Sequence, residues 1–471
     1  MYRFFLSVSL LLWTFLSSAQ ILVKSEVIAT YTQIQLFGFG LPATNGIELH
    51  KLWYNTIGSD GTADVASGLV VVPDQEDVFP LLCFQHGTTS PRENVPSNDM
   101  GTFSEYFWGS SGYVVASADY IGMGESRGFH PYLHAETQAS AAIDLLRATK
   151  EFCEQQQIDL NEQLFVTGYS QGGHAAMAAF KDLEEKHSDE FTVTAAAPMS
   201  GPYNLSGTMR ANAVVEEEYF FPGYLIYQVR GYQEVYGDIY NELTDIFKPR
   251  YAAIIENFDN QEEFPLGELN DTLINILVEE AGASIPKFMF QEEVLEAVIA
   301  NDINNRLVQV WTENDVYDWT PQAPTQIYYC EGDEQVPFEN AIFTDSIMNA
   351  NGATDVSALS MGAALDHFGC AFVAYPDALS FFNGFKVSST DDLQQTTAAT
   401  IIYPNPSQDV LYWYNNSLAI KEIFVLDQLG RTILQANQKE NFVNISGLAQ
   451  GLYFLQLWTA EGAIVKRFVK E

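Results

Sequence analysis

The stretch Gly168-Tyr169-Ser170-Gln171-Gly172-Gly173 decides the fold. It follows the apolar run 163–167, which predicts a buried strand, and it precedes 174–180, which predicts a helix. A serine in Gly-x-Ser-x-Gly between a strand and a helix sits on a turn so tight that its backbone is strained and its hydroxyl stands free above the sheet. The small residues two positions before and two positions after the serine leave no side chains where the strand and the helix cross. The pattern predicts a catalytic Ser170; the alternative is a glycine-rich turn with a capping serine.

Strand-like and helical runs alternate from about residue 66 to residue 382. Amphipathic helices are predicted over 137–155 and 172–186. Buried strands that alternate with helices are typical of a mostly parallel sheet covered on both faces, an α/β fold. The expected strands are 66–72, 80–85, 112–118, 163–167, 193–198 and 325–330.

The alternation stops between residues 203 and 318, where Glu, Tyr, Phe and Leu recur at helical spacing, as in 271–280 and 291–300. This spacing predicts a mainly helical insertion above the sheet. Such an insertion walls the substrate pocket and carries specificity. The aromatic runs 219–221 and 224–227 either line that pocket or belong to the core.

The two ends of the chain carry signals of their own. Residues 1–19 contain Arg3, an apolar stretch and small residues before Gln20, which predicts a cleaved signal peptide; an uncleaved anchor is the alternative. No other segment has the length and apolar character of a membrane span. The expected parts of the chain are a catalytic domain over 20–387, a polar linker over 388–400 and a small all-β domain over 401–471.

The charge of the chain is strongly negative, with 61 acidic and 22 basic residues and a formal net charge of −39. Such a charge repels nucleic acid and anionic head groups, so nucleic acid is not an expected partner. The excess lies before residue 401, because acidic and basic residues are equal in number after it. Solubility accounts for the excess; an acid-lined site for a cationic substrate is the alternative.

Four cysteines, Cys83, Cys153, Cys330 and Cys370, are few for a disulfide scaffold and allow three pairings. A Cys330–Cys370 bridge is expected if the loops that hold them meet. No CxxC motif or His/Cys cluster indicates a metal site, and no cofactor is predicted.

A serine nucleophile needs an imidazole base and a carboxylate that orients it, in the chain order Ser, Asp or Glu, His for this type of sheet. Of the histidines that follow Ser170, His174 lies on the serine's own helix and His187 lies in a charged helix end. His367 is therefore the predicted base. It lies in the small-residue loop 364–370, and its alternative is a capping or core histidine.

The predicted acid is Asp333, which follows the expected strand 325–330 and so lies at the carboxyl edge of the sheet. Glu331, Glu334 and Asp366 are its rivals. Asp366 is too close in sequence to His367 to reach its ring easily. A solvated loop carboxylate is the alternative for each.

Two backbone amides are needed to bind the oxyanion formed during attack. The first is the amide of Gln171, directly after the serine. The second comes from the loop after the strand 80–85, where Thr88 is the choice and Gly87 is close behind. His86 in the same loop is predicted to be structural. The Gly-x-Gly at 122–124 lacks the full dinucleotide fingerprint, so nucleotide binding is rejected.

With these motifs, residues 66–382 resemble the secretory lipases, which are α/β-hydrolases with a helical lid. The resemblance rests on Gln85-His86-Gly87-Thr88, Asp119-Tyr120-x-Gly-x-Gly-x-Ser126, the serine motif with His174, and Asp318-Trp319-Thr320-Pro321 before Gly332-Asp333-x-x-Val336-Pro337. It implies that Asp333 is the acid. The lid segment does not match motif by motif.

The tail is similar to the C-terminal sorting domain of type IX secretion. The similarity rests on Tyr403-Pro404-Asn405-Pro406, Asp427-x-x-Gly430-Arg431 and Gly447-Leu448-x-x-Gly451-Leu452-Tyr453. It implies periplasmic transit and then release from the cell or attachment to its surface. A carbohydrate-binding or adhesive β-sandwich is the alternative.

These residues together predict a secreted serine hydrolase of carboxylic esters, acting on a small-molecule or lipid ester. Ser170, His367 and Asp333 are its predicted catalytic triad. A serine peptidase of the same fold and a non-catalytic surface binding protein are the alternatives.

Overall fold

The computed structural model describes residues 20–98, 103–259, 264–387, 401–414, 420–427, 431–436, 442–458 and 463–471. The chain divides into two compact units, with the boundary in the sequence between Lys386 and Val387. The expected signal peptide and linker lie outside the described residues. Each unit is described by itself below.

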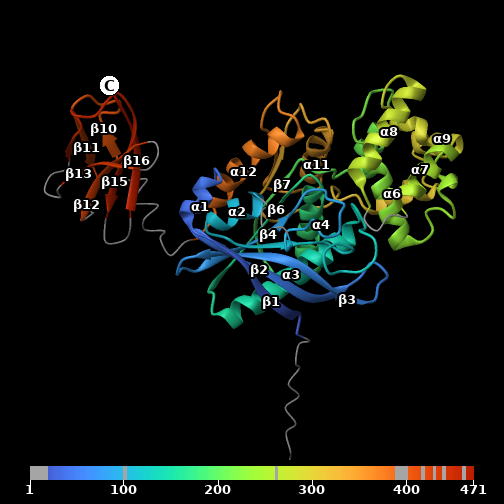
Figure 1. The fold of residues 1–471 in the computed structure, drawn as a ribbon, viewed down its shortest axis with the longest axis horizontal. Helices are drawn as coiled ribbons and strands as arrows, with labels where there is room; N and C mark the ends of the chain where they lie inside the picture. Colours follow the sequence, from blue (N-terminus) through green and yellow to red (C-terminus); the bar gives the residue numbers. More distant parts are fainter. Residues whose placement is uncertain are drawn as a thin grey trace, which may run out of the picture. The chain divides into compact units, whose positions relative to one another are not determined.

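One nine-stranded sheet forms the centre of the first unit, in the order β1-β2-β3-β5-β4-β6-β7-β8-β9 (Figure 1). The pairings from β1 to β5 are antiparallel, and those from β5 through β4 to β9 are parallel. The mostly parallel α/β sheet that the sequence predicts is therefore confirmed. The strands are β1 (Leu22–Tyr31), β2 (Gly46–Ile57), β3 (Ala63–Asp74), β4 (Phe79–Gln85), β5 (Val114–Ala118), β6 (Leu160–Tyr169), β7 (Val193–Met199), β8 (Thr325–Tyr329) and β9 (Val356–Ser360).

Three of these strands, β1, β2 and β9, are additional to the six expected ones. β1 and β9 are the two edge strands of the sheet. Most of their residues are half-buried or exposed. They therefore lack the continuous apolar runs by which buried strands are found in a sequence.

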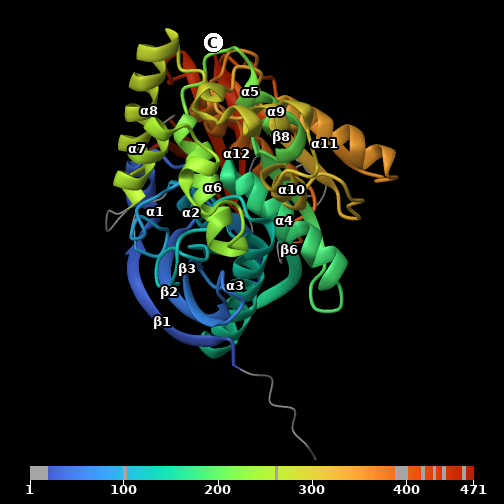
Figure 2. The same cartoon turned by 90° about the vertical axis from the view of Figure 1, so that its right-hand side faces the viewer.

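Helices cover both faces of this sheet (Figures 1 and 2). On one face α3 (Ala135–Gln156), α4 (Gln171–Lys186) and α11 (Glu339–Ala350) contribute to a single apolar core. On the other face α1 (Gln33–Gly38), α2 (Phe103–Ser110) and α12 (His367–Asn383) contribute to a second core.

A helical insertion separates β7 from β8, as predicted. Its helices α6 to α9, yellow-green in Figure 1, lie together and apart from the helices that flank the sheet. They share an apolar core of their own. The helices are α5 (Arg210–Val214), α6 (Pro222–Tyr236), α7 (Pro249–Asp259), α8 (Leu266–Ala281), α9 (Glu292–Ala300) and α10 (Arg306–Glu313), preceded by a π-helical turn (Leu205–Met209) and with short 3₁₀ turns (Leu243–Asp245, Pro286–Met289).

The second unit consists of strands alone among its described residues. Three strands pair in the order β10-β11-β14 and four in the order β13-β12-β15-β16, all antiparallel. Buried side chains such as Trp413, Val425 and Phe468 form one core. The small all-β domain is confirmed. Its strands are β10 (Ile401–Tyr403), β11 (Val410–Tyr414), β12 (Glu422–Leu426), β13 (Thr432–Ala436), β14 (Phe442–Asn444), β15 (Gly451–Trp458) and β16 (Ala463–Lys470).

Candidate active site

The backbone of Ser170 is strained at the turn between β6 and α4. Its φ is 63° and its ψ is −122°, outside the regions that a side chain favours. The neighbouring glycines explain why the turn is this tight. A Cβ at Gly172 would lie 1.9 Å from the carbonyl oxygen of Gln85, and one at Gly168 would lie 2.2 Å from that of Gly172. Only glycine fits at both positions, so the sequence motif and the strained turn require one another.

The sequence-predicted residues gather at the carboxyl edge of the parallel strands. Thr88 follows β4, Ser170 follows β6, Asp333 follows β8, and His367 lies in the connection after β9. Carboxyl ends of parallel strands share one edge of a sheet, which is where ligand sites form.

Asp333 and His367 are joined by a short hydrogen bond. The His367 ring Nδ1 lies 2.6 Å from Asp333 Oδ2, and both side chains are at least nine-tenths buried. Asp333 Oδ1 accepts from the amides of Gln335 and Val336 at 3.0 and 2.9 Å. One carboxylate oxygen is thus fixed by the backbone while the other holds the imidazole.

His367 is the first residue of helix α12, so the expectation that it lies in a loop is wrong. Asp366 caps this helix, because its side chain accepts from the amide of Gly369. The small residues at 364–370 suggested a loop, but aspartate, as at position 366, is among the residues preferred at a helix N-cap.

The three rival carboxylates have other partners. Glu331 accepts from the Ser360 hydroxyl at 2.7 Å, and Glu334 accepts from the backbone amide of His367 at 2.9 Å. Asp366 is the helix cap described above. Of the four candidates, Asp333 is the carboxylate on the imidazole ring.

Tyr169, the residue before the serine, contacts the histidine directly. Its hydroxyl donates to the carbonyl oxygen of His367 at 2.5 Å, and the two rings lie 5.1 Å apart between centroids. The described residues contain no hydrogen bond between Ser170 Oγ and His367 Nε2.

The other histidines near the site are structural. Burial lowers the pKa of His86, His130 and His174 to about 4, so each ring is neutral at pH 7. His174 packs inside the sheet's helical layer, where Nε2 donates to the carbonyl of Asn314 at 2.9 Å. His187 lies at the C-terminal end of α4, as expected.

Two backbone segments flank Ser170 with free amides. Gln171 begins α4, and Gly87 lies so close that a Cβ on it would be 4.0 Å from Ser170 Cβ. Among the described residues, neither the Gln171 amide nor the Thr88 amide donates to an acceptor. The Gln171 side chain is fixed as well, since its Nε2 donates to His130 Nε2 at 2.7 Å. Sequence reasoning missed this role of His130.

A disulfide connects the segment before Asp333 to the helix that begins at His367. Cys330 and Cys370 are bonded, which confirms the pairing expected if their loops meet. The loops do meet, because a Cβ at Gly332 would lie 2.7 Å from the carbonyl oxygen of Leu365. Cys83 and Cys153 are buried free thiols.

Four tyrosine hydroxyls tie the region around the insertion to the loops at the sheet edge. Tyr219 and Tyr224 donate to the carbonyl oxygen and the side-chain oxygen of Gln335, both at 3.0 Å. Tyr227 donates to the carbonyl oxygen of Thr89 at 3.1 Å. We call these three insertion residues the tyrosine clasp.

The fourth hydroxyl belongs to Tyr132, which precedes α3 and lies 3.0 Å from Thr88 Oγ1. Its ring stacks on Tyr227 with centroids 4.8 Å apart. Thr88 is therefore held indirectly by the insertion. Both alternatives for the aromatic runs hold, because Tyr219 and Tyr224 line the pocket beside Ser170 while Tyr227 belongs to the insertion's apolar core. No spacing in the sequence revealed the partners of these hydroxyls.

A pocket that is partly open to solvent extends from Ser170 into the insertion. Its walls are mainly apolar and aromatic, with Leu205, Met209 and Leu225 among them. At its side in the insertion the Trp311 indole donates to Gln228 at 2.8 Å. The position of Ser170 in the wall of a mainly apolar pocket suits the binding of a substrate's nonpolar part.

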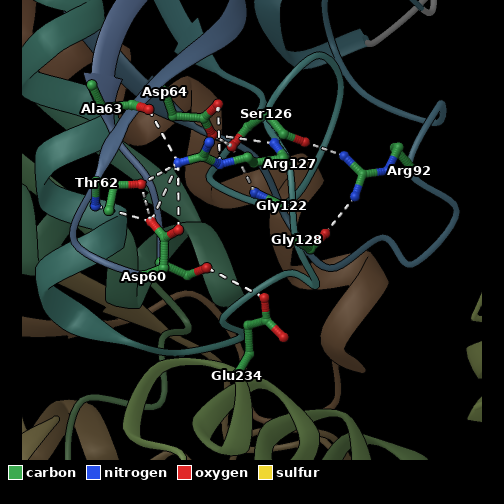
Figure 3. A network of polar contacts seen from close by, with 11 residues as sticks. Asp60, Thr62, Ala63, Asp64, Arg92, Gly122, Ser126, Arg127, Gly128 and Glu234 are labelled. Carbon is green, nitrogen blue, oxygen red and sulfur yellow. Dashed lines mark hydrogen bonds and ion pairs between the residues drawn. The ribbon is translucent and has the colours of Figure 1, made fainter.

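The glycine-containing loop 119–128 is a scaffold. Ser126 Oγ donates to Asp64 at 2.7 Å, and Arg92 donates to the carbonyl oxygens of Ser126 and Gly128, as drawn in Figure 3. The amide of Gly122 donates to Ser126 Oγ at 3.1 Å. These bonds fix the loop to the start of β3, so it has a structural role beside the site.

No metal site is evident in the part of the chain that the structure describes, since no group of three or more His, Cys, Asp or Glu side chains is arranged to hold an ion. Within the same residues no helix has both the length and the hydropathy of a membrane span.

Comparison with family models identifies residues 102–387 as a secretory lipase domain. The chain belongs to the secretory lipase family. It is therefore a carboxylic ester hydrolase of the lipase and esterase type. No curated protein matches this secretory lipase significantly in sequence.

Solved structures agree with this assignment. The rice cell wall degrading esterase LipA from Xanthomonas oryzae is 28% identical, with a TM-score of 0.69 over 78% of this chain and 99% of its own. A putative hydrolase from Legionella pneumophila is 25% identical, also with a TM-score of 0.69, over 78% and 98%. Candida antarctica lipase A in its closed state, at 16% identity and a TM-score of 0.57 over 78% and 82%, shares the fold.

Residues 401–471 of this secretory lipase match the secretion system C-terminal sorting domain. The tail therefore directs the protein to secretion or to the cell surface.

Proposed function

We propose that this secretory lipase cleaves carboxylic esters with Ser170 as nucleophile, His367 as general base and Asp333 as the carboxylate that orients the base. The observation that carries the proposal is the 2.6 Å hydrogen bond between His367 and a buried Asp333, next to a serine with a φ of 63°. A strained serine beside an oriented imidazole is the arrangement that activates a hydroxyl.

In the first half of the reaction Ser170 Oγ attacks the ester carbonyl and its proton passes to His367 Nε2. Nδ1 keeps its proton and donates it to Asp333 Oδ2, which fixes the tautomer. The imidazolium then protonates the departing alkoxide. In the second half His367 takes a proton from water, whose oxygen attacks the acyl carbonyl; the bond to Ser170 Oγ then breaks, the imidazolium returns its proton to Ser170 Oγ, and the acid is released.

The tetrahedral oxyanion is bound by the amides of Gln171 and Thr88. Both lack an acceptor among the described residues, and both belong to segments held by other contacts. Donors fixed in place before the reaction stabilise the transition state without reorganising. Each such donor contributes about 100- to 1000-fold in turnover.

The free enzyme has no hydrogen bond from Ser170 to His367 among its described residues, which is compatible with this role. Catalytic hydrogen bonds are often long in free enzymes and shorten when substrate binds.

The proposal includes the division of the chain into a catalytic domain, a lid and a sorting domain. Residues 20–387 form the catalytic domain, with the insertion at 203–318 as its lid. Residues 401–471 engage the type IX secretion machinery after the signal peptide 1–19 has been removed.

Labelling of the protein with a fluorophosphonate, followed by mass spectrometry of the adduct, tests the nucleophile. We expect the adduct on Ser170, and its loss in Ser170→Ala and His367→Ala while both variants keep the wild-type melting profile. An adduct elsewhere, or labelling that survives His367→Ala at the wild-type rate, contradicts the triad. A matched ester and amide pair then separates the esterase from a peptidase of the same fold.

A further inference from the structure

Among the residues that the structure describes, the cavity beside Ser170 is lined by a positively charged residue and by no acidic one, although the protein is strongly acidic. The chain carries 61 acidic residues, yet no aspartate or glutamate is among the described residues that line this cavity. Its charged lining residue is Arg210, at the start of α5. A cation in a mainly apolar cavity of a strongly acidic protein calls for an explanation.

Two carbonyl groups hold the Arg210 side chain in place. Its Nε donates to the carbonyl oxygen of Ser206 and its Nη1 to that of Val298, both at 2.6 Å. A guanidinium has five N–H donors, so donors remain after these two bonds. The described residues provide no further acceptor for them. The side chain is thus oriented by the protein and still able to bind a ligand.

The other cations of the insertion are neutralised or solvated, in contrast to Arg210. Arg230, Arg250, Lys287 and Arg306 each form an ion pair with a carboxylate, and Lys248 is exposed. Arg210 is half-buried and has no carboxylate partner among the described residues. Burial lowers its pKa, and no neighbouring acid offsets that effect. A partly desolvated guanidinium without a counter-ion is costly to the free protein.

We propose that Arg210 binds a carboxylate of the substrate, so that the preferred esters carry a free carboxylate on the part that enters the cavity. This rests on the proposed function, because Ser170 lies in the wall of the same cavity. The apolar walls accept the carbon chain between the ester and the carboxylate. A guanidinium matches a carboxylate with two parallel hydrogen bonds.

Matched ester pairs test the proposal. For the acyl part the pairs are 4-nitrophenyl hydrogen suberate against 4-nitrophenyl octanoate, and the hydrogen glutarate against the pentanoate. For the alcohol part the pair is 4-carboxyphenyl butanoate against its methyl ester. In either the acyl-part pairs or the alcohol-part pair, Arg210→Gln is expected to lower kcat/KM for the carboxylate-bearing ester by about 10- to 100-fold. The kcat/KM for its neutral partner is expected to change by less than about twofold.

Two control variants distinguish the effect of the Arg210 charge in the cavity from the effect of losing any positive charge of the insertion. Arg250→Gln removes the same charge from an exposed ion pair and is expected to leave all ratios unchanged. Arg210→Lys keeps the charge and is expected to retain part of the preference. If Arg210 serves only to bind the carbonyl oxygens of Ser206 and Val298, Arg210→Gln lowers kcat/KM equally for both esters of each pair, and the proposal is overturned. A wild type that cleaves the neutral esters but none of the carboxylate-bearing ones overturns it as well.

Binding of suberate to Ser170→Ala, measured by calorimetry, does not depend on turnover. We expect binding that is lost on adding Arg210→Gln, and an absence of binding overturns the proposal. If no ester at all is cleaved by the wild type while suberate still binds through Arg210, the proposed function fails and the anion site stands.

Discussion

The disulfide between Cys330 and Cys370 leads to a prediction about stability and catalysis together. Each cysteine lies three residues from a member of the proposed triad, and the two are 40 residues apart in sequence. The double variant Cys330→Ala/Cys370→Ala removes the link and keeps the fold's other contacts. Closing a loop of this length removes about 13 cal/mol/K of entropy from the unfolded chain, which corresponds to about 4 kcal/mol at 25 °C.

We therefore expect the double variant to lose about 4 kcal/mol of unfolding free energy. For a unit of this size that loss lowers the melting temperature by about 5–8 °C. Reductant should lower the melting temperature of the wild type by a similar amount and leave the double variant unchanged. The kcat for a 4-nitrophenyl ester should fall more than KM rises, because small shifts between Asp333 and His367 affect the reaction rather than binding.

Cys153→Ala is the matched control, because it removes a buried sulfur that forms no bridge. It should cost stability through a small cavity but keep the wild type's response to reductant. A double variant that melts with the wild type, or a wild type indifferent to reductant under denaturing heat, refutes the reasoning about the bridge.

Other predictions concern the turn, the clasp and one buried acid. Gly172→Ala should destabilise the protein by more than about 4 kcal/mol, since its Cβ would lie 1.9 Å from a backbone oxygen, whereas Gly267→Ala, with nothing within 4 Å, should raise the melting temperature slightly. Tyr224→Phe removes a hydrogen bond to Gln335 and should lower kcat severalfold with a shift in the pH–rate profile; an unchanged profile contradicts a positioning role. Burial raises the pKa of Asp315 to about 6, so its contribution to stability is present at low pH and is lost as the pH rises from about 4 to 6; melting curves of Asp315→Asn should therefore decline less than the wild type's over that window.

The parts of the fold that could be predicted are those whose sequence signals lie within one short stretch of the chain. The turn at Ser170 combines strand, glycines and helix within a short stretch, so its geometry follows from steric limits alone. The chain order of serine, acid and base then left His367 as the candidate. Asp333 was chosen by its place after a strand, and it is the carboxylate that reaches the imidazole.

The features that escaped prediction depend on contacts between distant segments. The partners of Tyr219, Tyr224 and Tyr227 lie on loops more than 100 residues away in sequence. His130 acts through the side chain of Gln171, 41 residues along the chain. The helical state of His367 was missed because a glycine such as Gly369 disfavours a helix locally, while α12 packs against the sheet through an apolar core that no local pattern shows.

The chemistry of the acceptors in the tyrosine clasp bears on how this region tolerates change. Tyr219 and Tyr227 donate to the backbone carbonyls of Gln335 and Thr89, which every amino acid at those positions supplies. Loops around the site can therefore drift in sequence, and with them the substrate range, while two of the bonds that join the insertion to the sheet edge persist. Tyr224 is the exception, because it depends on a glutamine side chain. Among homologues, position 335 should vary together with position 224, whereas positions 89 and 227 should vary independently as long as 227 keeps its hydroxyl.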